Sequence, residues 1–171
     1  MACKRDFYYK YILRLHEQDE FEDEMTASTF GTIVHKVLED GFNTLKNRVL
    51  KSEDLKALIE NIPPLLLASV EEEYSLALTE SGENYLHFAI AEATLKKLIS
   101  IELDELNSGQ PRTVTAVEAD LNHAFSFDRG PFQTVRLHGK ADRIDLEGGE
   151  VVVTDYKTGA VKASELALKG D

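Results

Sequence analysis

Hydrophobic positions recur at helical spacing through the first two thirds of the chain. They do so in four segments: residues 4–15, 26–47, 52–78 and 83–106. A proline inside a helix kinks or ends it, so Pro63 and Pro64 should interrupt the third segment. The break at 107–111, Asn-Ser-Gly-Gln-Pro, ends this pattern. We therefore predict a helical part over residues 1–107.

Strand-like spacing replaces the helical spacing from residue 112 onward. We expect a strand over 112–121, a shorter piece over 124–127, a turn at 128–131 and then a long hairpin. A last helix should begin at 162–169. The strands form a sheet part over residues 112–171, and the two parts together make one mixed α/β domain.

A Gly-Gly dipeptide at 148–149 predicts a two-residue turn in the long hairpin. If Glu147 pairs with Glu150 across this turn, Asp142 lies opposite Asp155. Side chains alternate along a strand, so both aspartates share one face of the hairpin. The same face carries Ile144, Leu146, Val151, Val153 and Lys157. This face is apolar near the turn, and we expect it to be the core side.

Two carboxylates opposed on a core face repel each other unless one is protonated or a cation lies between them. A divalent metal ion is the simplest remedy. Lys157 adds a positive group to the same face, beside the place where the phosphate of a metal-bound substrate would lie. The alternative is a slipped register or a solvated strand end, in which Asp142 and Asp155 are ordinary surface charges.

Three further polar residues have more than one interpretation. His35 and Glu39 stand one turn apart at the edge of the apolar stripe of 26–47, a segment with Thr26 or Ser28 as its N-cap. A histidine there can equally be a core or boundary residue, and Glu39 can equally form helix-surface pairs. Glu118 lies in the β-branched run before the hairpin, where an exposed strand acid is the other interpretation.

Four segments resemble a known family. Gly139 to Asp145 reads Gly-Lys-Ala-Asp-Arg-Ile-Asp, and Val153 to Gly159 reads Val-Thr-Asp-Tyr-Lys-Thr-Gly. Both are similar to the RecB/AddB-type nuclease domain of the PD-(D/E)XK superfamily, also seen in CRISPR-associated RecB-like nucleases. Residues 30–39 resemble that family's G-x-x-x-H-x-x-x-E helix, and residues 2–13 its opening Cys-then-aromatic helix. The resemblance implies a restriction-endonuclease-like core sheet.

The resemblance also implies an activity and a set of site residues. It implies a Mg²⁺- or Mn²⁺-dependent DNA exonuclease of repair and recombination, part of a larger nuclease or helicase-nuclease. Asp142, Asp155 and Lys157 would be catalytic. His35, the two aspartates and the backbone carbonyl of Tyr156 would hold the metal, with Glu118 and Glu39 as possible additions. The alternative is a catalytically silent scaffold or DNA-binding module of a repair helicase complex, and a third is an acidic protein-interaction domain with chance matches.

Composition limits the cellular setting and the cofactors. The chain has 171 residues, of which 43% are hydrophobic, enough for one sizeable core. No apolar run approaches 18 residues and the start lacks a signal-peptide core, so we expect a cytoplasmic protein without a membrane partner. Cys3 is the single cysteine. It precludes an internal disulfide, and an iron–sulfur cluster, which takes four thiolates, is not supported within this chain.

Net charge opposes a DNA substrate. The formal charge is −12 and the pI is about 4.9, whereas DNA affinity comes largely from Lys and Arg. Six of the acids lie within residues 17–24, read as a solvated loop, and basic residues gather near the proposed site. We expect weak intrinsic DNA affinity, with capture delegated to a helicase domain or subunit. Nothing after Lys157 matches the family's Gln-x-x-x-Tyr helix, so we also expect a fragment of a longer protein.

Overall fold

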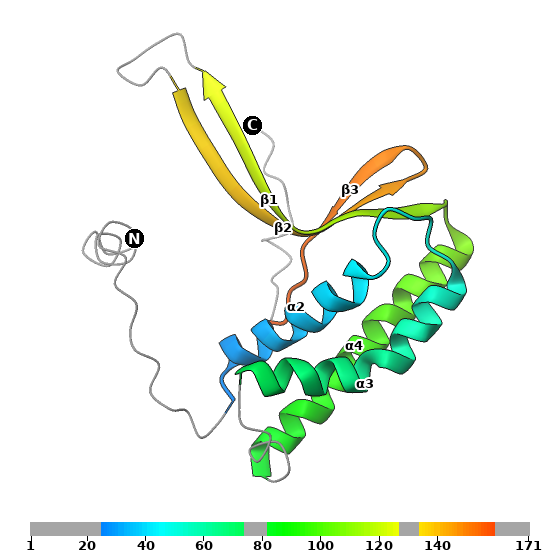
Figure 1. The fold of residues 1–171 in the computed structure, drawn as a ribbon, viewed down its shortest axis with the longest axis vertical. Coiled ribbons are helices and arrows are strands. Elements are labelled where there is room, and N and C mark those ends of the chain that lie inside the picture. The colour runs from blue at the N-terminus through cyan, green and yellow to red at the C-terminus, as the bar shows by residue number, and fades with distance from the viewer. Residues whose placement is uncertain (1–24, 74–81, 127–133, 160–171) are drawn as a thin grey trace, which may run out of the picture.

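The computed structural model describes residues 25–73, 82–126 and 134–159. Its elements follow one another in the order α2 (Ala27–Asn43), α3 (Ser52–Glu73), α4 (Gly82–Ser108), β1 (Arg112–Ser126), β2 (Thr134–Glu147) and β3 (Glu150–Thr154). Three helices pack beneath a three-stranded sheet, which confirms the mixed α/β class (Figure 1). The predictions for 4–15, 128–131 and 162–169 lie outside the described residues.

Helix α2 begins where the sequence predicted it but ends at Asn43, four residues before the predicted end. Thr26 is its N-cap, and the Thr26 hydroxyl accepts a hydrogen bond from the Thr29 N–H at 3.2 Å. The helix buries Ile33, Val34, Val37, Leu38 and Phe42 on one stripe. Gly41 faces α3, and a Cβ built on Gly41 would lie 2.6 Å from a methyl group of Leu58. The missing side chain therefore lets α2 and α3 approach closely.

Helix α3 continues through Pro63 and Pro64. Each proline removes a backbone donor and crowds the preceding turn, and α3 changes direction part-way along (Figure 1). The apolar stripe holds the helix together on both sides of the prolines. It consists of Leu55, Leu58, Ile62, Leu66 and Val70, all buried.

Helix α4 lies along α3 and closes the core. Its buried positions Ala91, Leu95 and Ile99 are spaced by one turn, and Val114 of β1 joins the same apolar cluster. Most of the core thus comes from helices, with the sheet laid over it. Among the described helices, none is long and apolar enough to span a bilayer.

Strands β1 and β2 pair antiparallel over nearly their whole length. The sequence predicted two pieces, 112–121 and 124–127, but one strand runs from Arg112 to Ser126. The prediction was wrong because pairing with β2 continues through Asn122 and His123, two residues with low strand preference. The far half of this hairpin extends away from the helices (Figure 1).

The predicted register of the β2–β3 hairpin is confirmed. Glu147 pairs with Glu150, and Ile144 pairs with Val153. The two turn glycines have positive φ angles of 57° and 94°, as a two-residue turn requires. The ladder ends one step before the two aspartates, because β3 stops at Thr154.

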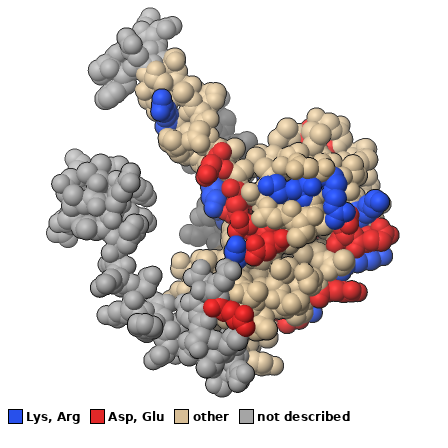
Figure 2. Space-filling model, viewed as in Figure 1, with Lys and Arg blue, Asp and Glu red and all other residues tan. Residues whose placement is uncertain are grey.

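The prediction for the core side of this hairpin is wrong. Leu146, Val151 and Val153 are 42%, 69% and 57% exposed, whereas Arg143 and Asp145 on the opposite face are 2% and 1% exposed. The helices cover the face that carries Arg143 and Asp145. These charges can be buried because Arg143 pairs with Asp145 and with Glu102 of α4. The sheet surface seen in Figure 2 is accordingly mostly uncharged.

Leu66 and Leu67 provide a matched test of the helical core. Leu66 is fully buried and Leu67 is 43% exposed. We expect Leu66→Ala to lower the free energy of unfolding by about 2–5 kcal/mol because it leaves a cavity. Leu67→Ala should change it by less than about 0.5 kcal/mol. Urea unfolding measures both, and equal losses would contradict the packing.

Candidate active site

Three side chains from three elements converge at one point beside the sheet. His35 comes from α2, Glu118 from β1 and Asp142 from β2, and one nitrogen or oxygen atom of each lies within 4.8 Å of the other two. All three side chains are partly buried. They line a cleft of about 550 Å³. We call these residues the donor cluster.

Backbone pairing brings the two acids of the donor cluster together. The residue pairs on either side of them are in regular register, so Glu118 lies directly opposite Asp142. Glu118 has a φ angle of 50°, in the left-handed region that strains a residue with a side chain. The ladder therefore skips this pair. Glu118 and Asp142 thus form a pair of opposed carboxylates, the kind of pair that the sequence predicted for Asp142 and Asp155.

Hydrogen bonding orients the carboxylate of Asp142. The backbone N–H of Tyr156 donates to its Oδ2 atom at 2.6 Å. Its Oδ1 atom lies 3.5 Å from Nδ1 of His35. The His35 ring is edge-on to the Tyr156 ring, with centroids 6.4 Å apart. One oxygen of Asp142 is thus fixed by the backbone, while the other faces the histidine.

Glu118 has a cationic neighbour on the adjacent strand. Its carboxylate contacts the ammonium group of Lys140. The hydrogen bond and the charge of Glu118 raise the pKa of Lys140 above its ordinary value. Acidic and basic side chains lie side by side at the base of the projecting hairpin, as Figure 2 shows. Two carboxylates nevertheless face each other beside this lysine, which favours a further cation there.

Asp155 and Lys157 lie just past the end of β3. The Lys157 Nζ atom is 2.6 Å from Oδ2 of Asp155, and the two side chains are 61% and 53% exposed. Asp155 is the chief cause that raises the pKa of Lys157. Neither residue belongs to the donor cluster. The segment runs on along α2, where a Cβ built on Gly31 would lie 3.2 Å from the Thr158 hydroxyl (Figure 1).

Glu39 lies at the border of the cleft but outside the donor cluster. Its carboxylate is 3.7 Å from the Lys36 ammonium group, which also lies 3.2 Å from Asp40. Helix-surface pairing was one of the two interpretations of Glu39. The role of Glu39 at the site stays a prediction.

A buried polar cluster next to the donor cluster was not found from the sequence. It comprises Glu102, Arg143, Asp145 and Tyr156. Burial raises the pKa of Asp145, although Arg143 acts against this shift. One signal was present: Glu102 follows Leu95 and Ile99 on the buried stripe of α4, and an acid at such a position requires a buried partner.

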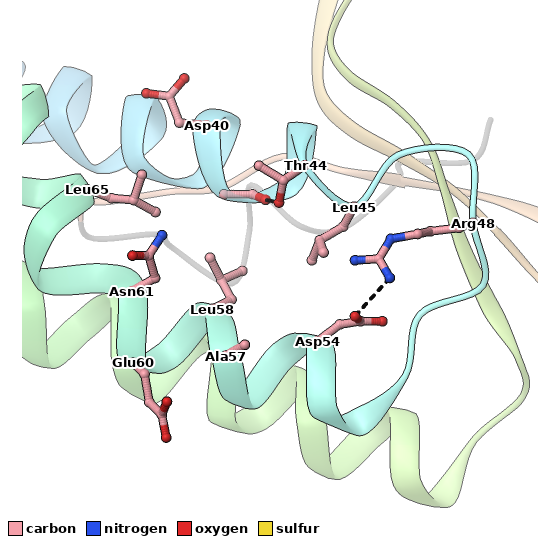
Figure 3. Close-up of a pocket in the computed structure, with 11 residues that line it drawn as sticks. Asp40, Thr44, Leu45, Arg48, Asp54, Ala57, Leu58, Glu60, Asn61 and Leu65 are labelled. Carbon is pink, nitrogen blue, oxygen red and sulfur yellow. Dashed lines mark hydrogen bonds and ion pairs between the residues drawn. The ribbon is translucent and has the colours of Figure 1, made fainter.

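A second hollow of about 480 Å³ lies between the C-terminal part of α2 and α3 (Figure 3). Its Arg48 and Asp54 are paired with each other at 2.9 Å. Asp40, at the other end, is paired with Lys36. Leu45 and Leu58 fill the space between these ends (Figure 3). Asp40, Arg48 and Asp54 are thus each paired with an opposite charge, and they form no group of converging ligand atoms.

The donor cluster suits a divalent cation. Carboxylate oxygens are preferred ligands of Mg²⁺ and Mn²⁺, and a neutral imidazole is a suitable nitrogen ligand for Mn²⁺. A cation between Glu118 and Asp142 would also remove the repulsion between them. The groups present therefore fit a metal ion.

Comparison with known proteins identifies the family. The chain matches the family model of the PD-(D/E)XK nuclease superfamily over residues 1–170. It is 27% identical over 178 residues to an ATP-dependent helicase/deoxyribonuclease subunit of Clostridium perfringens (strain SM101 / Type A), covering 94% of the chain and 14% of that protein. It is 30% identical over 164 residues to the uncharacterized protein RT0391 of Rickettsia typhi, covering 91% of the chain and 17% of that protein.

A further relative has a similar name and a similar coverage. An ATP-dependent helicase/deoxyribonuclease subunit of Lactobacillus johnsonii is 26% identical over 178 residues, with 90% of the chain and 15% of that protein covered. The chain thus spans less than a fifth of the length of these curated relatives. No solved structure matches the chain. Because the family match extends over nearly all of its residues, the chain belongs to the PD-(D/E)XK nuclease superfamily.

Proposed function

We propose that this chain is the nuclease domain of a larger DNA-processing protein and that it hydrolyses phosphodiester bonds in DNA with Mg²⁺ or Mn²⁺. The observation that carries the proposal is the donor cluster, in which His35, Glu118 and Asp142 converge within 4.8 Å. Membership of a nuclease superfamily supports the reaction class.

Each residue of the site has a task in this proposal. His35, Glu118 and Asp142 would hold the metal, with Asp155 and the backbone carbonyl of Tyr156 as further ligands. When bound, the ion supplies Lewis acidity, which activates water and neutralises charge on the phosphate. The exposed ammonium group of Lys157 would stabilise charge that develops on the phosphate oxygens.

The names of the relatives support a setting for the reaction. Two of them are named as subunits of an ATP-dependent helicase/deoxyribonuclease, and the chain spans only about a seventh of each. We place this domain beside a helicase domain or subunit, acting as an exonuclease in DNA repair and recombination in the cytoplasm. The formal charge of −12 supports delivery of DNA by other parts of the protein.

A second candidate is a silent nuclease-fold scaffold or DNA-binding module. The pairing of Asp155 with Lys157 favours it, because each charge already has a partner outside the donor cluster. This candidate predicts that the protein binds DNA but does not cut it. Cleavage and metal binding, measured on the intact protein and its variants, separate the two candidates.

Removal of metal tests the proposed reaction itself. We expect the intact protein to release nucleotides from DNA in Mn²⁺ and to stop in excess EDTA, because the donor cluster holds two carboxylates that need a cation. Added Mn²⁺ should restore release, and a fluorescent DNA substrate measures it. Persistent cleavage in EDTA would contradict the proposal, and binding without cleavage in Mn²⁺ would favour the silent scaffold.

Lys157→Ala tests the stabilisation of charge on the phosphate. We expect the turnover number to fall by about 10²- to 10³-fold, as when another preorganised charge-stabilising group is removed. Lys97→Ala is the matched control, since Lys97 is an exposed lysine of α4 that does not line the cleft of the donor cluster. Steady-state cleavage measures both variants. If Lys157→Ala cuts DNA as fast as Lys97→Ala does, Lys157 has no catalytic role.

Glu118→Gln tests the metal ligands without any DNA. Loss of a residue that merely supports a ligand costs about 10- to 100-fold in metal affinity, so loss of a ligand charge should weaken Mn²⁺ binding by about tenfold or more. Asp120→Asn, an exposed acid two residues further along β1, is the control and should bind Mn²⁺ as the unmodified protein does. Calorimetric titration compares the two, and equal affinities would remove Glu118 from the site.

A further inference from the structure

We infer that Glu102, Arg143, Asp145 and Tyr156 form a positioning cluster that fixes the catalytic Asp-x-Lys segment against the donor cluster. The inference rests on the proposed function, adds three residues to it and gives the side chain of Tyr156 a role of its own. They touch no substrate, and they act by holding other groups in place.

Arg143 joins the elements that carry the site. Its NH1 atom donates to Glu102 of α4 at 3.0 Å, and its Nε atom donates to Asp145 of β2 at 3.0 Å. Its guanidinium lies 4.2 Å from the ring centre of Phe42 on α2. A planar fork with fixed donor directions sets the angles between its partners as well as their distances.

Tyr156, the middle residue of the Asp-x-Lys segment, is the fourth member of the cluster. Its hydroxyl accepts from Arg143 NH1 at 2.6 Å and donates to Glu102 Oε1 at 3.2 Å. The partly buried side chain is therefore held by two hydrogen bonds.

The main chain of Tyr156 transmits this anchoring to the site. Its N–H donates to Asp142 at 2.6 Å and so directs one carboxylate of the donor cluster. Asp155 and Lys157 flank it and project to solvent. One anchored side chain thus fixes a metal-binding carboxylate and the lysine at once. Asp142 and Arg143 are also neighbours in β2. The carboxylate that Tyr156 directs and the guanidinium that anchors Tyr156 therefore come from the same strand.

The free energy of burial alone does not explain why these positions hold charged and polar side chains. Buried ion pairs are often replaceable by apolar side chains without loss of stability, because desolvation offsets their attraction. What apolar side chains cannot supply is direction. The positioning cluster combines four directional contacts around Arg143 and Tyr156, adjacent to the groups that must be oriented.

Tyr156→Phe in the intact protein is the diagnostic variant. It removes only the hydroxyl and leaves Arg143 paired with Glu102. We expect the Mn²⁺ dissociation constant to rise about tenfold and the turnover number on DNA to fall about tenfold, the effect of losing a group that orients a ligand. The control is Tyr85→Phe on α4, where Tyr85 is 60% exposed. Titration calorimetry, cleavage and urea unfolding are measured on each variant.

The readouts separate positioning from a structural role. A purely structural role predicts a lower free energy of unfolding with unchanged Mn²⁺ affinity and turnover in folded protein, and this result would overturn the inference. If the unmodified protein binds Mn²⁺ but does not cut DNA, only the proposed function is refuted. The Mn²⁺ affinities of the unmodified protein and of Tyr156→Phe still test the positioning role. If unmodified protein binds no Mn²⁺, both proposals fall.

A second variant tests whether the members act as one unit. Glu102→Gln keeps the size of the side chain but removes the charge between Arg143 and Tyr156. We expect it to weaken Mn²⁺ binding too. The double variant with Tyr156→Phe should bind Mn²⁺ no more weakly than the worse single variant, because both substitutions loosen the same anchoring of Tyr156. Effects that multiply would show two independent residues and would overturn the cluster.

Discussion

A single buried guanidinium connects the parts of this fold. Arg143 is 2% exposed and contacts α2 through Phe42, α4 through Glu102, its own strand through Asp145 and the segment after β3 through Tyr156. Burial alone lowers its pKa, but the surrounding groups outweigh that effect and hold the pKa above its ordinary value. The helices and the sheet thus pack so that the partners of Arg143 surround its charge.

The site depends on this arrangement because its groups come from different elements. His35 stands on a helix, whereas Glu118 and Asp142 stand on neighbouring strands, so no single element determines the distances between them. Glu118 also occupies a strained backbone conformation, of the kind that persists only where the surrounding structure enforces it. Strain of this kind gathers at functional sites, which agrees with a metal between the two carboxylates.

The sequence predicted local features well and layer contacts poorly. The Gly148-Gly149 turn fixed the hairpin register, and the apolar stripe placed His35 at the edge of its helix, because both follow from short-range periodicity. The core side of the hairpin was misassigned because hydrophobicity points to the wrong face. The apolar face is exposed, and the buried face holds Arg143 and Asp145. Glu102, the partner of Arg143 on α4, lies 41 residues away from it, beyond the reach of any local pattern.

The central claim is that a divalent ion binds between the side chains of His35, Glu118 and Asp142. Crystals of the protein soaked in Mn²⁺ and measured at a wavelength with a strong manganese anomalous signal test it most directly. We predict an anomalous peak in contact with the imidazole and with both carboxylates. A peak bound elsewhere, or one that contacts Asp155 while Glu118 points away, would contradict the account.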